Sequence, residues 1–168
     1  MPRVYHLVRE QFIPRPRDEV YAFFARPENL QLLTPAFLHF AFLTPSPIAM
    51  HAGARIDYRI KLWGVPMRWA TRIDRFEPPL LFTDEQLRGP YRRWHHTHEF
   101  HEVEGGTRMV DRVEYELPFG PLGRAAHRFF VRRSLRQIFD YRRQKVAELW
   151  SAADCPAETS GGASGRRK

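Results

Sequence analysis

The sequence predicts a single α+β domain in which an antiparallel sheet is combined with one long C-terminal helix. Between residues 37 and 117, apolar and polar side chains alternate with a period of two, and turn residues recur about every ten positions, which is typical of an antiparallel meander. Over residues 122–150 the apolar period becomes that of a helix. A chain of 168 residues is also long enough to close one hydrophobic core.

The N-terminal region predicts one strand followed by two short helices. Residues 3–12 have the alternation of a strand. The segment that opens with Pro14 predicts a helix, because proline fits a first helical turn and the acidic residues Asp18 and Glu19 suit the positive end of the helix dipole. A second short helix is predicted over residues 28–33, where a Thr-Pro pair ends it.

The rest of the chain predicts the sheet and the long helix. Six further strands are predicted, over residues 37–43, 55–63, 67–76, 81–87, 91–103 and 107–117. The helix over residues 122–150 carries two sets of apolar residues on rotated faces, which indicates either a helix that packs differently along its two halves or a kink near Val131. Residues 151–168 are small and polar and predict a disordered basic tail, so the domain is expected to span residues 1–150.

The composition limits the possible partners. A formal net charge of +8 would suit nucleic acid, but the basic residues are spread over almost every segment, so we predict no nucleic-acid partner. They concentrate only on the C-terminal helix, at Arg124, Arg128, Arg132, Arg133, Arg136, Arg142 and Arg143. The simplest interpretation is a solvated helix face. A weak contact of this helix with an anionic membrane or an acidic protein is an additional hypothesis.

The sequence also indicates the compartment. It shows no signal peptide and no apolar run of the roughly 18 residues that a spanning helix requires, so we expect a cytoplasmic protein. Cys155 is the single cysteine and lies in the predicted tail. A disulfide within the chain and a thiolate metal site are therefore excluded.

Residues 88–100 contain the strongest functional signal. When the stretch is interpreted as a turn and a strand, one face carries Trp94, His96, His98 and Phe100. Because aromatic residues stand at both ends of this face, we predict that it is buried. Two imidazoles then point into an apolar interior, where they are either satisfied by polar partners or carry chemistry.

Counting across the turns predicts which residues share this inward face. A two-residue loop at Gly105-Gly106 places His96 opposite Tyr115 and His98 opposite Val113, and a loop at Gly64-Val65 places Tyr58 opposite Thr71. The same counting makes Asp84 level with Ile73. The predicted inward set is Tyr58, Trp69, Thr71, Asp84, Gln86, Trp94, His96, His98, Asp111 and Tyr115. A mostly apolar and aromatic lining with a few polar groups is typical of a small-molecule pocket.

Several short motifs resemble those of a known superfamily. They are Pro27-x-Asn29-Leu30, Gly53-x-x-Ile56-Asp57-Tyr58-Arg59, Pro66-x-x-Trp69, Phe82-x-Asp84-Glu85-Gln86-x-x-Gly89-Pro90-Tyr91, Trp94-x-His96-x-His98-x-Phe100 and Pro118-Phe119-Gly120-Pro121. Residues 1–150 thus resemble the SRPBCC superfamily, also called START-like or Bet v 1-like, and its bacterial polyketide cyclase/dehydrase or ligand-binding branch. This resemblance implies a helix-grip fold, with a curved antiparallel sheet of about seven strands wrapped around the C-terminal helix and a cavity between them. Members bind lipids, sterols, hormones, polyketides or quinones, and only some are enzymes.

Three hypotheses follow for the pocket. In the first, it binds a hydrophobic molecule such as a lipid, an isoprenoid or a polyketide-like compound, through Tyr58, Trp69, Thr71, Gln86, Trp94, Tyr115 and Phe129. In the second, the protein is a cofactor-independent cyclase or dehydratase. Its acid/base pair would then be a histidine, His96 or His98, with a carboxylate, Asp84 or Asp111, and Tyr115 would bind the developing enolate.

The third hypothesis is a metal site. A His-x-His strand places two imidazoles on one face, and Asp84 or Asp111 is available as a further ligand. The sequence offers no third histidine for this face. We therefore predict no metal and no cofactor.

Overall fold

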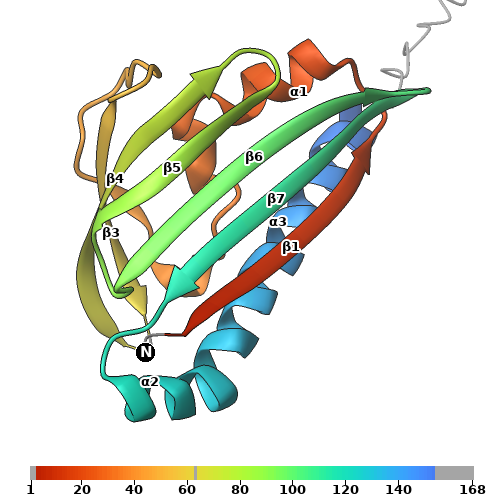
Figure 1. Cartoon of the computed structure of the whole chain (residues 1–168). Helices are drawn as coiled ribbons and strands as arrows, with labels where there is room; N and C mark the ends of the chain where they lie inside the picture. Colours follow the sequence, from red (N-terminus) through yellow and green to blue (C-terminus); the bar gives the residue numbers. More distant parts are fainter. Residues whose placement is uncertain (1–2, 63, 154–168) are drawn as a thin grey trace, which may run out of the picture.

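The computed structural model describes residues 3–62 and 64–153 and shows the predicted α+β architecture. A seven-stranded antiparallel sheet, in the order β1-β7-β6-β5-β4-β3-β2, curves around a long helix (Figure 1). Helix α3 crosses the inner face of the sheet and α2 lies at the end of the sheet where the chain begins (Figure 1). None of the helices in the described parts of the chain is both long and apolar enough to cross a membrane.

The elements agree with most of the predicted ranges. The strands are β1 (Val4–Ile13), β2 (Ala41–Phe42), β3 (Arg55–Leu62), β4 (Val65–Glu77), β5 (Leu81–Arg88), β6 (Arg93–Val103) and β7 (Gly106–Glu116). The helical elements are α1 (Arg17–Phe24), η1 (Pro27–Gln31), η2 (Ala36–Leu38), α2 (Gly120–Ala126), η3 (His127–Val131) and α3 (Arg132–Ala153). Of the predicted tail, residues 151–153 continue α3 and residues 154–168 lie outside the described residues.

Two local predictions are corrected. The strand expected over residues 37–43 shrinks to β2, because η2 occupies its first part and His39 has a positive φ of 45°, which breaks an extended backbone. The long helix is interrupted at η3, a π-helical turn that ends at Val131. The kink predicted near Val131 therefore corresponds to a widened turn where α2 meets α3.

The predicted strand pairing is wrong by two residues at two hairpins. Val103 pairs with Gly106, so the β6–β7 loop is one residue earlier than expected and His98 faces Asp111. Gly105 takes a φ of +77°, a conformation that glycine adopts without strain. The β3–β4 hairpin is shifted by the same amount, since Tyr58 of β3 pairs with Trp69 of β4 where Thr71 had been expected. Because a shift of two keeps every side chain on its face, the predicted inward set survives this correction.

The β4–β5 pairing is as predicted, since Asp84 lies opposite Ile73. A bulge between Ile73 and Arg75 follows it. Most of the hydrophobic core is divided between two ends of the space between the sheet and α3, and a smaller group consists of Ala54, Ile56 and Ile73. Under α1 the core consists of Ile13, Val20, Tyr21, Phe24, Leu33, Phe82, Phe100, Met109, Val146 and Trp150. Towards η3 it consists of Ile60, Trp69, Trp94, Val113, Tyr115, Val131, Leu135 and Phe139.

Candidate functional site

A cavity of about 190 Å³ lies between the sheet and α3, bounded by members of both core clusters. The 3-10 turn η1 contributes Pro27, Asn29 and Leu30 to its wall, and α3 contributes Leu135 and Phe139. Strands β3 to β6 contribute aromatic and branched side chains from their inward faces. The wall is therefore apolar over most of its area, as expected for a site that takes an uncharged organic molecule.

A group of five polar residues, here called the polar cluster, stands at one side of this cavity. It consists of Asp84 on β5, His96 and His98 on β6, Asp111 on β7 and Arg142 on α3. The strand register assembles the first four, because Asp84 is paired with His96 and His98 is paired with Asp111. Both histidines are buried, with exposed fractions of 5% and 3%. The two imidazoles predicted to point inward therefore do so and meet two carboxylates there.

Each imidazole of the polar cluster lies between the two carboxylates. His96 Nε2 donates to Asp111 Oδ1 at 2.8 Å, and its Nδ1 lies 3.4 Å from Asp84 Oδ2. His98 Nε2 donates to Asp84 Oδ2 at 3.2 Å. Its Nδ1 lies 2.9 Å from Asp111 Oδ1, but without the alignment of a hydrogen bond. The centroids of the two imidazole rings are 3.8 Å apart.

The surroundings distribute charge unequally over the polar cluster. Burial alone would raise the pKa of Asp111, but the Arg142 guanidinium and the two imidazoles hold that pKa well below its ordinary value. Burial would lower the pKa of His98, yet its contacts with Asp111 and Asp84 outweigh burial and raise it. The pKa of His96 is lowered by burial and by the neighbouring His98. Of the two imidazoles, His98 is thus the one on which these contacts favour an extra proton.

Arg142 is a site residue that sequence reasoning missed, because it was grouped with the solvated arginines of the C-terminal helix. Its side chain is only 14% exposed, and Nη1 lies 3.6 Å from Asp111 Oδ1. The guanidinium also lies over the ring of Phe24 at 5.5 Å. The signal was present in the helical spacing, since position 142 falls three residues after Phe139 and four before Val146, which are both buried.

Four of the seven predicted contact residues line the cavity: Tyr58, Trp69, Thr71 and Trp94. Tyr91, from the turn before β6, lines it as well and was not predicted. Its ring packs against Trp94, with ring centroids 4.8 Å apart. Tyr91 was missed because it lies outside the alternating part of its strand.

The other three predicted contact residues lie elsewhere. Gln86 is held by the backbone of Tyr91, donating to its carbonyl oxygen at 2.7 Å and accepting from its N–H at 3.3 Å. The hydroxyl of Tyr115 forms a 2.9 Å hydrogen bond with His127 Nε2. Phe129 is 65% exposed on the π turn η3. The register shift places Tyr115 opposite Trp94 instead of His96.

The structure also places His127 and corrects one further prediction. The ring of His127 stacks on Tyr5 with centroids 3.7 Å apart. Asp111 was expected on the cavity wall, but it lies behind the two histidines, against Arg142 and Phe139 of α3. Asp111 therefore acts on the cavity through His96 and His98.

Four buried side-chain atoms of cavity-lining residues have no hydrogen-bond partner within the described parts of the chain: Nε1 of Trp69, Oγ1 of Thr71, Nδ1 of His98 and Nε of Arg142. His98 Nδ1 faces Asp111 at 2.9 Å, whereas the N–H groups of Trp69 and Arg142 are donors without such a neighbour. Buried donors are nearly always hydrogen-bonded in native proteins. These two N–H groups can therefore donate hydrogen bonds to oxygen atoms of water or of a bound molecule, at two places on a mostly apolar wall.

Comparison with known proteins gives one family and a consistent fold. A family model described as polyketide cyclase / dehydrase and lipid transport matches residues 13–140. No curated protein matches the sequence. Protein TTHA0849 from Thermus thermophilus has a similar structure, with 21% identity, a TM-score of 0.64, and coverage of 89% of this chain and 99% of that chain. Major latex-like protein 151 from Panax ginseng is 12% identical over 88% of this chain and 97% of that chain, with a TM-score of 0.64.

A larger protein contains a similar domain. The nucleoside-diphosphate sugar epimerase from Corynebacterium glutamicum is 26% identical over 84% of this chain, with a TM-score of 0.61. Only 28% of that protein is covered. The same fold therefore occurs both as nearly a whole chain and as a part of a longer one.

Proposed function

The chain belongs to the polyketide cyclase/dehydrase and lipid transport family, and on that basis we propose that it binds a hydrophobic small molecule in the cavity between the sheet and α3. The supporting observation is an apolar cavity whose wall carries unpartnered N–H groups on Trp69 and Arg142. An apolar cavity of about 150 Å³ already binds benzene. A space of about 190 Å³ therefore suits a lipid, isoprenoid or polyketide-like compound of which a ring or short chain enters the cavity.

The two ends of the cavity define the chemistry of this molecule. The indole N–H of Trp69 and the guanidinium of Arg142 are donors, so each favours a carbonyl, hydroxyl or carboxylate oxygen. Between them the wall consists of side chains such as Ile60 and Leu135, which favour hydrocarbon. The proposed ligand is thus an apolar skeleton with oxygen functions at separated positions.

Native mass spectrometry of freshly purified protein tests this proposal. A bound ligand appears as an excess mass that disappears on denaturation. Ile138→Trp adds bulk to the cavity wall from α3 and should remove the excess mass, whereas Leu87→Trp, at an exposed position of β5, should retain it. Protein that carries no excess mass from several expression hosts, and that binds no apolar fluorescent probe, would contradict the proposal.

A second candidate function is proton transfer in the same cavity, and the contacts of two cavity-lining imidazoles with two carboxylates favour it. His98, whose pKa is raised, is the acid, and His96, whose pKa is lowered and whose Nδ1 carries the lone pair while Nε2 donates to Asp111, is the base. In a dehydration, His96 removes a proton next to a carbonyl, and His98 protonates the hydroxyl group that leaves as water. Arg142 replaces Tyr115 as the group that stabilises the enolate oxygen, because the Tyr115 hydroxyl is engaged by His127.

Turnover of an aromatic β-hydroxy ketone provides the test of this second function. Dehydration should be lost in both His96→Ala and His98→Ala and retained in His95→Ala, on the outward face of the same strand. Activity that persists in both inward variants would exclude histidine acid/base chemistry.

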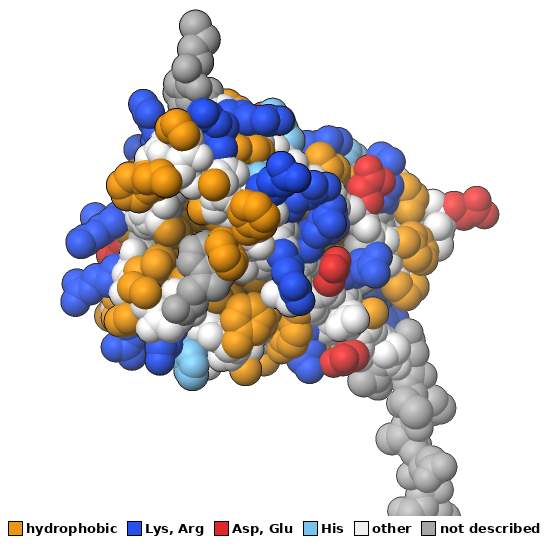
Figure 2. Space-filling view, turned by 90° about the horizontal axis from the view of Figure 1, so that it is seen from below, with side chains coloured by type: hydrophobic (Ala, Val, Ile, Leu, Met, Phe, Trp, Pro, Cys, Tyr) orange, Lys and Arg blue, Asp and Glu red, His pale blue; other side chains and the backbone are white. Residues whose placement is uncertain are grey.

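The surface around α2 and η3 is the proposed partner contact. Phe119, Leu122, Phe129 and Phe130 are each at least 59% exposed there. The same segment carries Arg124, Arg128, Arg132, Arg133 and Arg136, and residues 117–139 contain no acidic residue. Figure 2 shows hydrophobic and basic side chains side by side on this end of the molecule. Exposed apolar side chains among arginines favour an anionic membrane, from which the ligand would be taken or to which it would be delivered.

A further inference from the structure

Asp84, His96 and His98 form a group that can surround a small cation. All three line the cavity, and one ligand atom from each lies within 4.8 Å of the others. We propose that these three residues bind one divalent transition-metal ion at the polar end of the cavity. The proposal does not depend on the identity of the organic ligand.

The distances between the ligand atoms fit such an ion. Zinc–nitrogen and zinc–oxygen bonds of about 2.0–2.1 Å at tetrahedral angles place neighbouring ligand atoms about 3.3 Å apart. Asp84 Oδ2 lies 3.4 Å from His96 Nδ1 and 3.2 Å from His98 Nε2. Both separations match without movement of the backbone. An ion at this point would replace the proton that His98 now shares with Asp84.

Asp111 is the carboxylate that lies near the second ring nitrogen of each histidine. Metal-binding histidines direct their second ring nitrogen to a carboxylate or carbonyl oxygen, which fixes the tautomer and the ring orientation. Asp111 Oδ1 lies 2.8 Å from Nε2 of His96 and 2.9 Å from Nδ1 of His98. One buried carboxylate thus contacts both rings from the side away from the cavity, His96 through a hydrogen bond and His98 through a short ion-pair distance, and leaves His96 Nδ1 and His98 Nε2 for the ion.

The charge of the polar cluster also favours a cation. Two carboxylates are opposed by one guanidinium, so the cluster has one excess negative charge when both imidazoles are neutral. A buried unpaired charge is costly. A divalent ion would offset this charge while using both histidines as ligands.

Two histidines and one carboxylate leave at least one coordination position open. This combination occurs in catalytic zinc sites and in non-haem iron sites, where water or substrate completes the coordination. Here the open position faces an apolar cavity, where Arg142 Nε has no partner among the described residues. The fourth ligand would therefore be an oxygen of the organic molecule or a water, and the ion would polarise that oxygen as a Lewis acid. The sequence analysis named Asp84 as an available ligand but predicted no metal because a third histidine is lacking; in this proposal Asp84 takes the place of that histidine.

The test uses the full chain, freed of metal by a chelator and titrated with Co²⁺ and Zn²⁺ in the absence of organic ligand. We expect one tight equivalent of each, with the visible absorption of four- or five-coordinate Co²⁺, and a melting temperature that rises with Zn²⁺ concentration. Asp84→Asn and His98→Gln preserve side-chain size and should lose the tight equivalent. Asp111→Asn should weaken it by about 10- to 100-fold.

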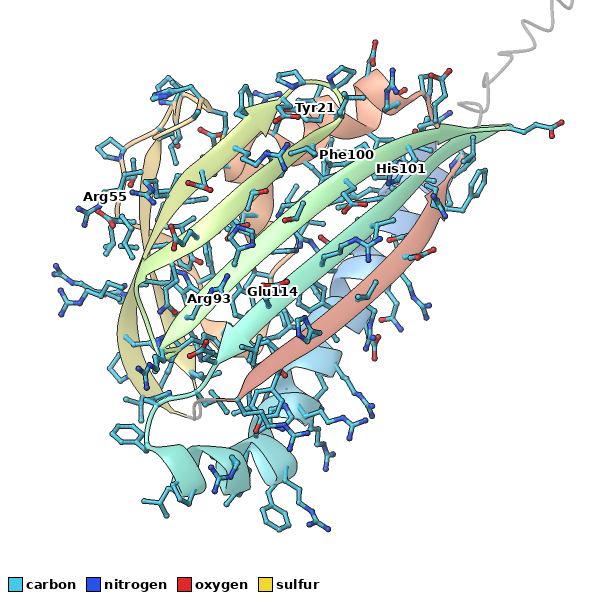
Figure 3. All side chains as sticks on the ribbon, in the orientation of Figure 1. Tyr21, Arg55, Arg93, Phe100, His101 and Glu114 are labelled. Carbon is cyan, nitrogen blue, oxygen red and sulfur yellow. The ribbon has the colours of Figure 1, made fainter. Side chains whose placement is uncertain are left out.

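His101→Ala is the matched control. His101 lies near the end of β6 (Figure 3), and its Nε2 is 3.1 Å from Glu99 Oε2. Such a surface pair can bind metal adventitiously. The tight equivalent should remain in this variant. No tight equivalent in the wild-type chain would overturn the proposal. A tight equivalent that survives in Asp84→Asn and His98→Gln, or that is lost in His101→Ala, would overturn it as well.

Discussion

His98 on β6 is paired across the sheet with Asp111 on β7, and its Nδ1 lies 2.9 Å from a carboxylate oxygen of that residue. The same oxygen also accepts the hydrogen bond from His96 and faces Arg142. A single buried carboxylate thus supports three cationic or polar side chains, two from strand β6 and one from helix α3. The polar cluster depends on it both for its charge balance and for its shape.

Asp111→Ala should therefore destabilise the protein strongly. It leaves the Arg142 guanidinium and two imidazoles buried without their common partner, and breaking a buried ion pair costs about 3–5 kcal/mol. Urea unfolding followed by circular dichroism measures the loss. Glu114→Ala, on the outward face of the same strand, should cost about 1 kcal/mol or less, because its ion pair with Arg93 is exposed (Figure 3). Equal effects of the two variants would refute the role of Asp111.

Arg142→Met should weaken ligand binding while it preserves packing against Phe24 and Phe139. The variant removes the unpartnered N–H and the charge that we assign to a ligand oxygen. Loss of a hydrogen bond to a charged group costs about 1.5–3 kcal/mol, or roughly 10- to 100-fold in affinity. Titration with the ligand released by denaturation measures this. Arg143→Met, at the adjacent exposed position, is the control and should bind normally.

Binding to anionic vesicles should depend on the arginines of η3 and α3. Each arginine near a negatively charged surface contributes about 1 kcal/mol, so replacing Arg128, Arg132 and Arg133 with Gln should weaken binding by roughly 100-fold. Sedimentation with phosphatidylserine vesicles measures it. The control replaces three exposed arginines of the sheet, Arg68, Arg93 and Arg108, with Gln. Unchanged binding of the first variant would exclude this surface, and binding to polyglutamate but not to vesicles would indicate an acidic protein instead.

Glu28 should titrate below its ordinary pKa of 4.5, because the backbone N–H of Ile48 donates to its carboxylate at 2.9 Å. This bond ties η1 to the loop before β3, and Pro27 and Met50 from these two segments line the cavity. Since the pKa is lower in the folded chain, the stabilisation is present above pH 4.5 and is lost as the pH falls through the folded value. The Ile48 amide signal in NMR spectra reports this titration, and Glu28→Gln should abolish it. A midpoint at or above 4.5 would contradict the bond.

The architecture was predictable from the sequence, and the resemblance to the SRPBCC superfamily is confirmed by the family match and the fold. The alternation of apolar and polar residues is a local property, so it identified the strands and the inward face of His96 and His98 without knowledge of the pairing. The strand predicted over residues 37–43 was wrong, because the alternation of apolar and polar residues does not reveal that His39 adopts a left-handed backbone conformation.

The sequence by itself determined which side chains face inward, because the two-residue period of a strand depends only on residues that are neighbours in the chain. The tertiary structure alone decided which of them meet. The pairing of His98 with Asp111, where Tyr115 and Val113 had been expected beside the histidines, depended on the loop position at which a glycine takes a positive φ. The burial of Arg142 depended on how α3 docks against β6 and β7. Register and helix placement are set by contacts between segments far apart in the chain, and a local pattern does not contain them.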